Sequence, residues 1–156
     1  MNNFIELINL SKIFFEKKNV KVLKKINYKF KLGKIYSLMG PSGSGKSTLL
    51  NIISLIDRPS QGIIKFQNNV IDFNDKKEND IFRANNIGII YQQDNLLSDF
   101  TALENVYLAK LSLINNKKKA VQAANDIIKK MGLIDRINHY PSELSGGEMQ
   151  RVAIAR

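Results

Sequence analysis

The sequence contains no cysteine among its 156 residues, so no disulfide framework holds the fold together, which fits a reducing compartment. It also lacks any run of about 18 apolar residues, which predicts that no helix crosses a membrane. The first residues carry no basic stretch, and Glu6 and Lys12 interrupt the apolar residues that follow them. We therefore expect no signal peptide and a protein that works from the cytosol.

The formal net charge of +10 is the strongest bias in the composition. Such a charge favours nucleic acid or an anionic membrane surface as a partner. The lysines are scattered, however, and clusters such as Lys24-Lys25, Lys76-Lys77 and 117–119 lack the interleaved aromatic residues of a base-stacking platform. We interpret the charge as a solvated surface and expect no nucleic-acid partner.

Hydrophobic periodicity predicts an α/β chain of one domain. Alternating apolar and polar residues predict antiparallel strands over Phe4–Leu10 and Val20–Phe30. Two short apolar runs, Ile35–Met39 and Ile87–Tyr91, predict buried strands. Helical spacing predicts a helix over Ser47–Ile56, which Asp57-Arg58-Pro59 then stops.

The rest of the chain reads as one hairpin followed by helices. Residues Gly62–Ile71 predict a hairpin whose turn lies at Asn68-Asn69. Thr101 and Glu104 form a capping-box pattern, so a helix is expected from there to about Leu113. Two further helices are predicted, one containing Ala120 to Met131 with its C-cap at Gly132, and one over Gly147–Arg156.

Residues 40–47 read GPSGSGKS and fit the pattern G-x-x-x-x-G-K-[ST]. In this pattern the backbone amides of a glycine loop surround phosphate oxygens at a helix N-terminus. Lys46 is expected to reach the β and γ phosphates of ATP, and the Ser47 hydroxyl is expected to bind Mg²⁺. The predicted phosphate-binding residues are Gly40, Pro41, Ser42, Gly43, Ser44, Gly45, Lys46, Ser47 and Thr48.

A second glycine motif, LSGGE, occupies residues 144–148. Ser145 is placed to cap a helix, and Gly146 and Gly147 leave backbone amides accessible at its positive end. The motif therefore predicts a second phosphate clamp.

With both motifs present, the sequence resembles the ABC ATPase family over its whole length. The resemblance implies a P-loop NTPase cassette with an N-terminal antiparallel β subdomain and an inserted helical subdomain. It further implies that residues 1–93 form the RecA-like core with the antiparallel part, that 94–143 form the helical subdomain, and that 144–156 form the signature motif and its helix. In the family two subunits form a homodimer, and each ATP lies between the phosphate loop of one subunit and the signature of the other.

The resemblance also assigns roles to isolated residues. Gln92 matches the glutamine that touches Mg²⁺ or the attacking water and senses the membrane subunit, with Gln93 as the alternative. Gln92 and Lys46 are the predicted catalytic residues. Phe14 matches the aromatic residue that stacks on adenine, with core packing as the alternative. His139 precedes the signature, so it does not match the family's histidine and is read as a surface residue.

The apolar residues Leu96, Leu97 and Phe100 lie in an otherwise polar segment. We expect them to help dock a membrane subunit, with packing within the helical subdomain as the alternative, and both roles can hold at once.

Family members carry an apolar strand ending in Asp-Glu shortly after the signature helix, and this sequence stops at Arg156 before such a strand. The resemblance therefore implies a cassette truncated before its second Walker motif. The parent protein is expected to be an ATPase, whereas the chain alone is expected to be inactive. The segment Ile35–Met39 is then expected to lose a neighbouring strand and to expose an edge.

Two longer segments, 99–106 and 141–148, resemble the branch of the family that powers lipoprotein release from the bacterial inner membrane. That branch implies integral membrane subunits as partners and a place on the cytoplasmic face of the membrane. Alternatives are a macrolide-type exporter, a cell-division ATPase, or, remotely, an ABC ATPase that acts on nucleic acid.

Overall fold

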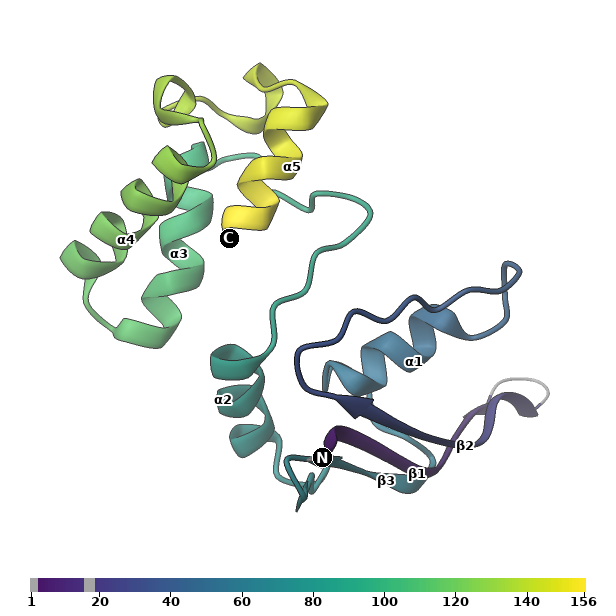
Figure 1. Cartoon of the computed structure of the whole chain (residues 1–156). Coiled ribbons are helices and arrows are strands. Elements are labelled where there is room, and N and C mark those ends of the chain that lie inside the picture. Colours follow the sequence, from purple (N-terminus) through teal and green to yellow (C-terminus); the bar gives the residue numbers. More distant parts are fainter. Residues whose placement is uncertain (1–2, 16–18) are drawn as a thin grey trace. The chain divides into compact units, whose positions relative to one another are not determined.

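The computed structural model describes residues 3–15 and 19–156. The chain divides into two compact units, Met1–Ile87 and Gly88–Arg156, and Figure 1 shows the elements of each. The elements of the first unit are β1 (Asn3–Phe15), β2 (Asn19–Lys31), α1 (Lys46–Ile53), β3 (Gln61–Phe66), β4 (Asn69–Val70) and α2 (Lys76–Asn86).

The first unit is built on an antiparallel sheet of order β2-β1-β3-β4. The long strand β1 pairs with β2 on one side and with β3 on the other, which confirms the two strands predicted at the N-terminus. The core lies between this sheet and α1, where Leu10 and Ile64 pack with Ile52 and all three side chains are fully buried. The sheet thereby carries the helix that follows the glycine loop.

The predicted hairpin is confirmed as β3 and β4, although its turn lies one residue earlier than expected. Gln67 and Asn68 adopt φ values of 47° and 71°. A two-residue hairpin turn that follows the twist of its strands needs positive φ at both central positions. The turn therefore uses Gln67-Asn68 instead of Asn68-Asn69.

The helix predicted over Ser47–Ile56 ends earlier, at Ile53. Leu55 has a φ of 59°, so it leaves the helical conformation, and the amides of Ile56 and Asp57 both donate to the carbonyl oxygen of Asn51. The chain thus turns tightly before the predicted stop at Asp57-Arg58-Pro59.

The two apolar runs predicted as buried strands do not form strands. Within the described residues neither 35–39 nor 87–91 joins a sheet, and Ile35 and Met39 are 101% and 86% exposed. A parallel strand is stable when neighbours pair with it and both faces are covered. The described strands are all antiparallel partners of one another, so these segments have no ladder to join. Segment 35–39 is exposed, but it forms no strand with an edge, so the predicted strand and its predicted burial are both wrong.

The second unit contains only helices, namely α3 (Ala102–Ile114), α4 (Lys117–Lys130), η1 (Ile134–Arg136), η2 (Pro141–Glu143) and α5 (Gly146–Ala155). The capping box predicted at Thr101 is present, because the Glu104 amide donates to Thr101 Oγ1 and the Thr101 amide donates to Glu104 Oε2. Gly132 has a φ of 68° after the end of α4, as its predicted C-cap role requires.

A separate core holds the helices of the second unit together. Val106 of α3, Ile128 of α4 and Val152 of α5 are all buried in it. Among the described residues, no helix has the length and apolar character that crossing a bilayer requires.

Candidate nucleotide-binding site

The loop that leads into α1 is fixed against the sheet by Gly45. This residue has a φ of 91°, which side chains other than glycine rarely adopt. A Cβ atom there would lie 2.9 Å from Val22 Cγ1 and 3.0 Å from Leu23 Cδ2. Glycine is therefore required twice, for its conformation and for the close approach of the loop to β2.

The N-terminus of α1 is left open by its sequence. Gly45 is the N-cap and offers no side chain, and within the described part of the chain the first turn contains no acidic residue. The first amides of a helix have no acceptor within the helix, and their summed dipoles favour an anion. This end of α1 thus fits a phosphate group.

Lys46 contributes a positive charge beside the same amides. Its Nζ atom donates to the carbonyl oxygens of Gly40 at 2.8 Å and Pro41 at 2.7 Å. These two hydrogen bonds therefore hold the ammonium against the start of the glycine loop. Ser47 is exposed at the second position of the helix, where its hydroxyl is accessible to a ligand. The loop residues predicted from the motif are thus brought together at one helix end.

Phe14 lies near the end of β1 and is 38% exposed. It is not among the residues of the sheet core, so the alternative of core packing receives no support. The Nζ atom of Lys12 lies 5.0 Å from the centroid of its ring. The accessible part of the ring fits the expected contact with a base.

Gln92 and the signature motif belong to the second unit, whereas the glycine loop and Phe14 belong to the first. Gln92 and Gln93 are both exposed and lie in the same bend, so the structure does not separate these two alternatives. Two residues later, the segment is tied to α5. Arg156 donates from its guanidinium to the carbonyl oxygens of Asp94 and Asn95.

The signature motif begins with a complete capping box. The Glu148 amide donates to Ser145 Oγ at 3.4 Å, and the Ser145 amide donates to Glu148 Oε2 at 2.8 Å. Arg136 adds a hydrogen bond from Nε to Glu148 Oε1 at 3.1 Å. The bonds from the Ser145 backbone and hydroxyl, and then Arg136, lower the pKa of Glu148 to about 2. The carboxylate therefore stays charged and fixes the start of α5.

The fold does not require the two glycines that follow Ser145. Neither Gly146 nor Gly147 has a left-handed φ. A Cβ atom would meet nothing within 4 Å at Gly146, and its nearest neighbour at Gly147 would be Arg151 Nη1 at 3.8 Å. Alanine favours a helix over glycine by up to about 1 kcal/mol. The fold of this unit therefore accepts alanine at both positions.

Sequence reasoning missed the role of Asn105. Its side chain is buried, accepts from the Leu97 amide and donates to the carbonyl oxygens of Leu97, Phe100 and Thr101. It thus shapes the loop before α3. The loop leaves Leu97 and Phe100 exposed, whereas Leu96 packs on the helical core. The packing role is therefore confirmed for Leu96, and docking by the other two residues stays a prediction.

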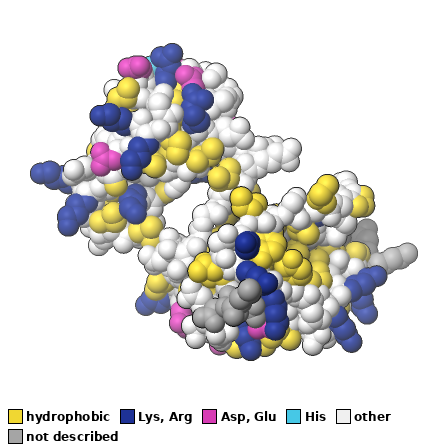
Figure 2. Space-filling view, viewed as in Figure 1, with side chains coloured by type: hydrophobic (Ala, Val, Ile, Leu, Met, Phe, Trp, Pro, Cys, Tyr) yellow, Lys and Arg dark blue, Asp and Glu magenta, His cyan; other side chains and the backbone are white. Residues whose placement is uncertain are grey.

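His139 is half-buried in the loop between η1 and η2, and its carbonyl oxygen accepts from the Ala102 amide. The predicted loop position is therefore confirmed, although the residue is less exposed than expected. Figure 2 shows the lysine and arginine side chains of each unit dispersed over the visible face, without one continuous patch.

A glycine loop at an open helix N-terminus and a capped LSGGE helix are the parts of an ATP-binding cassette of the P-loop class. Residues 23–156 match the family model described as ABC transporter, and the chain belongs to this family. It is similar to the lipoprotein-releasing system ATP-binding protein LolD of Rickettsia bellii, with 43% identity over 99% of this chain and 68% of the relative. The protein of the same name from Cytophaga hutchinsonii is 43% identical over 97% of this chain and 69% of its own length.

The fold is similar to that of a solved ATP-binding cassette in a dimeric, post-hydrolysis state bound to ADP and phosphate. The TM-score is 0.86 and the identity 38%, over 97% of this chain and 67% of the other. This chain thus spans about two thirds of the length of the relatives named.

Proposed function

We propose that this chain binds ATP with Mg²⁺ through the glycine loop and α1, and that the whole protein hydrolyses ATP to power a membrane transporter. The observation that carries the proposal is the open N-terminus of α1 beside Lys46 and Gly45. Backbone amides of Gly43 to Thr48 hold phosphate oxygens, and Lys46 exchanges its two carbonyl partners for the β and γ phosphates.

The Ser47 hydroxyl and Gln92 are the residues that would hold a magnesium ion, which would neutralise charge on the phosphates. Phe14 supports the adenine ring. Gln92 orients water near the γ phosphate, with Gln93 as its alternative. These roles rest on the fit of the residue types to the ligand and on the family to which the chain belongs.

The proposed assembly is a homodimer with ATP between the subunits. The support is the presence of Gly146 and Gly147 at positions where the fold itself accepts alanine. Ser145 and these two glycines then present α5 to the phosphates bound by the partner subunit. A related cassette forms a dimer with bound ADP and phosphate, which fits this arrangement.

The proposed cargo is bacterial lipoprotein, released from the inner membrane by integral membrane subunits with this protein on their cytoplasmic face. The support is the similarity to lipoprotein-releasing system proteins along nearly the full chain. Leu97 and Phe100, which are exposed beside α3, are the proposed contacts with the membrane subunits.

Nucleotide binding is tested by calorimetric titration of the chain with ATP and Mg²⁺. Lys46→Ala is expected to weaken the affinity for ATP at least about tenfold, because a charge-assisted hydrogen bond contributes about 1.5–3 kcal/mol. Lys34→Ala removes an exposed lysine of the preceding segment and is the matched control. Unchanged ATP affinity in Lys46→Ala contradicts the proposed site.

The cargo is tested in the protein's own cells. When Lys46→Ala replaces the native protein, lipoproteins are expected to accumulate in the inner membrane, as measured by membrane fractionation. Normal lipoprotein sorting together with loss of drug export or of cell division would instead support one of the two related ATPases.

A further inference from the structure

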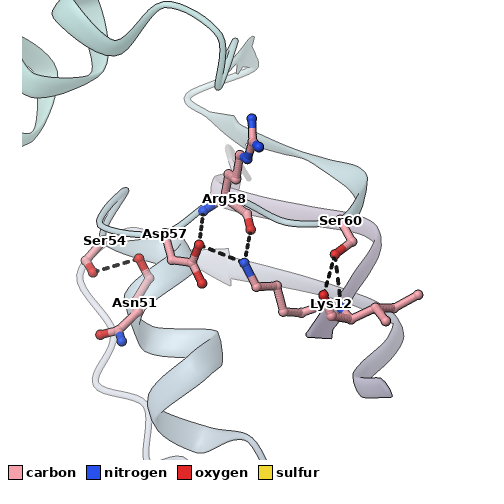
Figure 3. Close-up of polar contacts among 7 residues, drawn as sticks. Lys12, Asn51, Ser54, Asp57, Arg58 and Ser60 are labelled. Atoms are coloured by element: carbon pink, nitrogen blue, oxygen red, sulfur yellow. Dashed lines mark hydrogen bonds and ion pairs between the residues drawn. The ribbon is translucent and has the colours of Figure 1, made fainter. Parts of the chain in front are cut away.

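Lys12 is buried in the first unit although the proposed phosphate site does not use it. It is only 8% exposed, and lysine is seldom buried without a partner. Its Nζ atom donates to Asp57 Oδ1 at 2.7 Å and to the carbonyl oxygen of Arg58 at 2.8 Å, as Figure 3 shows. The residue therefore joins β1 to the turn that follows α1.

The same ammonium lies over the ring of Phe14, 5.0 Å from its centroid. An ammonium has three N–H donors, and the two oxygens use two of them. A cation within about 6 Å of a ring centroid is attracted to the negative face of the ring. Lys12 thus holds Phe14 from one side, while 38% of the phenylalanine remains exposed.

The turn after α1 is fastened to β1 along several residues. Ser60 accepts from the Ile13 amide at 3.0 Å and donates to the Ile13 carbonyl oxygen at 3.2 Å, and its own amide donates to the carbonyl oxygen of Ser11. Figure 3 shows the hydrogen bonds of Ser60 and those of Lys12 around this turn. Ser60 therefore fixes the backbone of both neighbours of Lys12, Ser11 and Ile13.

The phosphate loop contacts the sheet at Leu23, the strand partner of Lys12. Lys12 is paired with Leu23 of β2, and Leu23 is one of the two residues against which Gly45 packs. The pair Lys12 and Leu23 thus lies between two parts of the proposed site. One part is the Phe14 ring, which is proposed to bind the base, and the other is the loop, which is proposed to bind the phosphates. Lys12 contacts the Phe14 ring directly, whereas its link to the loop runs through Leu23.

We propose that Lys12 is a positioning residue for the nucleotide base, which holds the Phe14 ring where adenine is recognised and leaves phosphate binding unaffected. The inference rests on the proposed function, that is, on ATP binding with its base against Phe14. Preorganisation of the ring improves affinity because less conformational freedom is lost on binding.

The test compares ATP with inorganic tripolyphosphate, which has the phosphates but no base, in calorimetric titrations of the full chain with Mg²⁺. Lys12→Met is expected to weaken the affinity for ATP about tenfold, which is the size expected for the loss of one desolvated cation–ring contact. The affinity for tripolyphosphate is expected to change by less than about twofold. Lys12→Arg keeps the charge above the ring and is expected to restore most of the ATP affinity.

A double substitution shows whether Lys12 acts through the ring. Phe14→Leu alone is expected to weaken the affinity for ATP by a similar factor. Lys12→Met added to Phe14→Leu is expected to weaken it by less than about twofold more, because contacting residues that act together are not additive. Full additivity would overturn the inference.

Lys29→Met is the matched control, because it removes an ion pair to Glu6 across the same two strands without touching Phe14. It is expected to bind both ligands normally. An equal loss of ATP and tripolyphosphate in Lys12→Met would mean that the lysine only stabilises the fold, and the inference would fail. If Lys12→Met does not fold, Lys12→Met with Asp57→Asn removes the unpaired carboxylate and is measured in its place.

The proposed function has its own outcome in the same assay. If Lys46→Ala binds tripolyphosphate as tightly as the native chain, the phosphate site is wrong. If Lys46→Ala loses both ligands while Lys12→Met behaves like the native chain, only the role of Lys12 is wrong.

Discussion

The guanidinium of Arg156 donates a hydrogen bond of 2.6 Å to the carbonyl oxygen of Asn95. It also reaches the carbonyl oxygen of Asp94 at 3.1 Å. The last residue of the signature helix region thereby holds the segment that follows Gln92. A side chain as well as the backbone therefore links these two parts.

Arg156→Ala is expected to loosen residues 94–97. Loss of a hydrogen bond to a charged group costs about 1.5 kcal/mol or more, so amide exchange at Leu97 should rise about tenfold. Hydrogen exchange followed by mass spectrometry measures this. Arg151→Ala, which removes an exposed arginine within α5, should leave the exchange unchanged, and equal effects of both variants would contradict the proposed link.

Gly147→Ala is expected to separate stability from assembly. The free energy of unfolding should stay the same or rise by up to about 1 kcal/mol, because the helix accepts alanine there. ATP-dependent dimerisation, measured by sedimentation, should be lost if a phosphate must approach this backbone. Gly132→Ala is the reverse control. Its left-handed φ predicts a loss of about 1 kcal/mol with no effect on dimerisation.

The pKa of Glu148, lowered to about 2, predicts how stability depends on pH. The folded state binds this proton more weakly than the unfolded state does. The stabilisation from Glu148 is therefore complete above the ordinary value of 4.5 and is lost as the pH falls toward 2. Carboxyl ¹³C NMR should give a pKa near 2, and Ser145→Ala and Arg136→Leu should each raise it. A pKa that stays the same in both variants would contradict the assigned cause.

Leu97→Asp is expected to disrupt docking without unfolding the helical unit. Leu97 is 48% exposed, so an aspartate there remains solvated and the melting temperature should change little. Co-purification with the membrane subunits should fall sharply. Leu113→Asp, which places the same charge at an exposed leucine near the other end of α3, should co-purify normally. Equal retention of the partner by both variants would favour the packing role of this segment.

Local signals in the sequence predicted the starts of α3 and α5 to within one residue. The capping boxes at Thr101 and Ser145 each involve residues only three positions apart, so their partners can be identified by inspection. The same pattern at Asp75 and Glu78, where the Glu78 amide donates to Asp75 Oδ1, marks the start of α2. That helix was not predicted because it is polar and buries no residue fully.

Contacts between distant residues could not be predicted in the same way. Lys12 and Asp57 are 45 positions apart, and Arg156 and Asn95 are 61 positions apart. The segment Ile35–Met39 has the composition of a buried strand, but strand formation depends on a partner that composition does not reveal. The motifs therefore identified the phosphate loop and the signature, whereas the residues that position them required the structure.

The separate cores of the two units have a consequence for how the protein unfolds. Leu10 and Ile52 belong to one buried cluster, and Ile128 and Val152 belong to the other. Each cluster draws its residues from within a single unit, so each supplies its own cooperativity. A substitution that melts the helices around Val152 is therefore expected to leave the glycine loop in place on its sheet, and the chain is expected to keep binding nucleotide after the signature helix has unfolded.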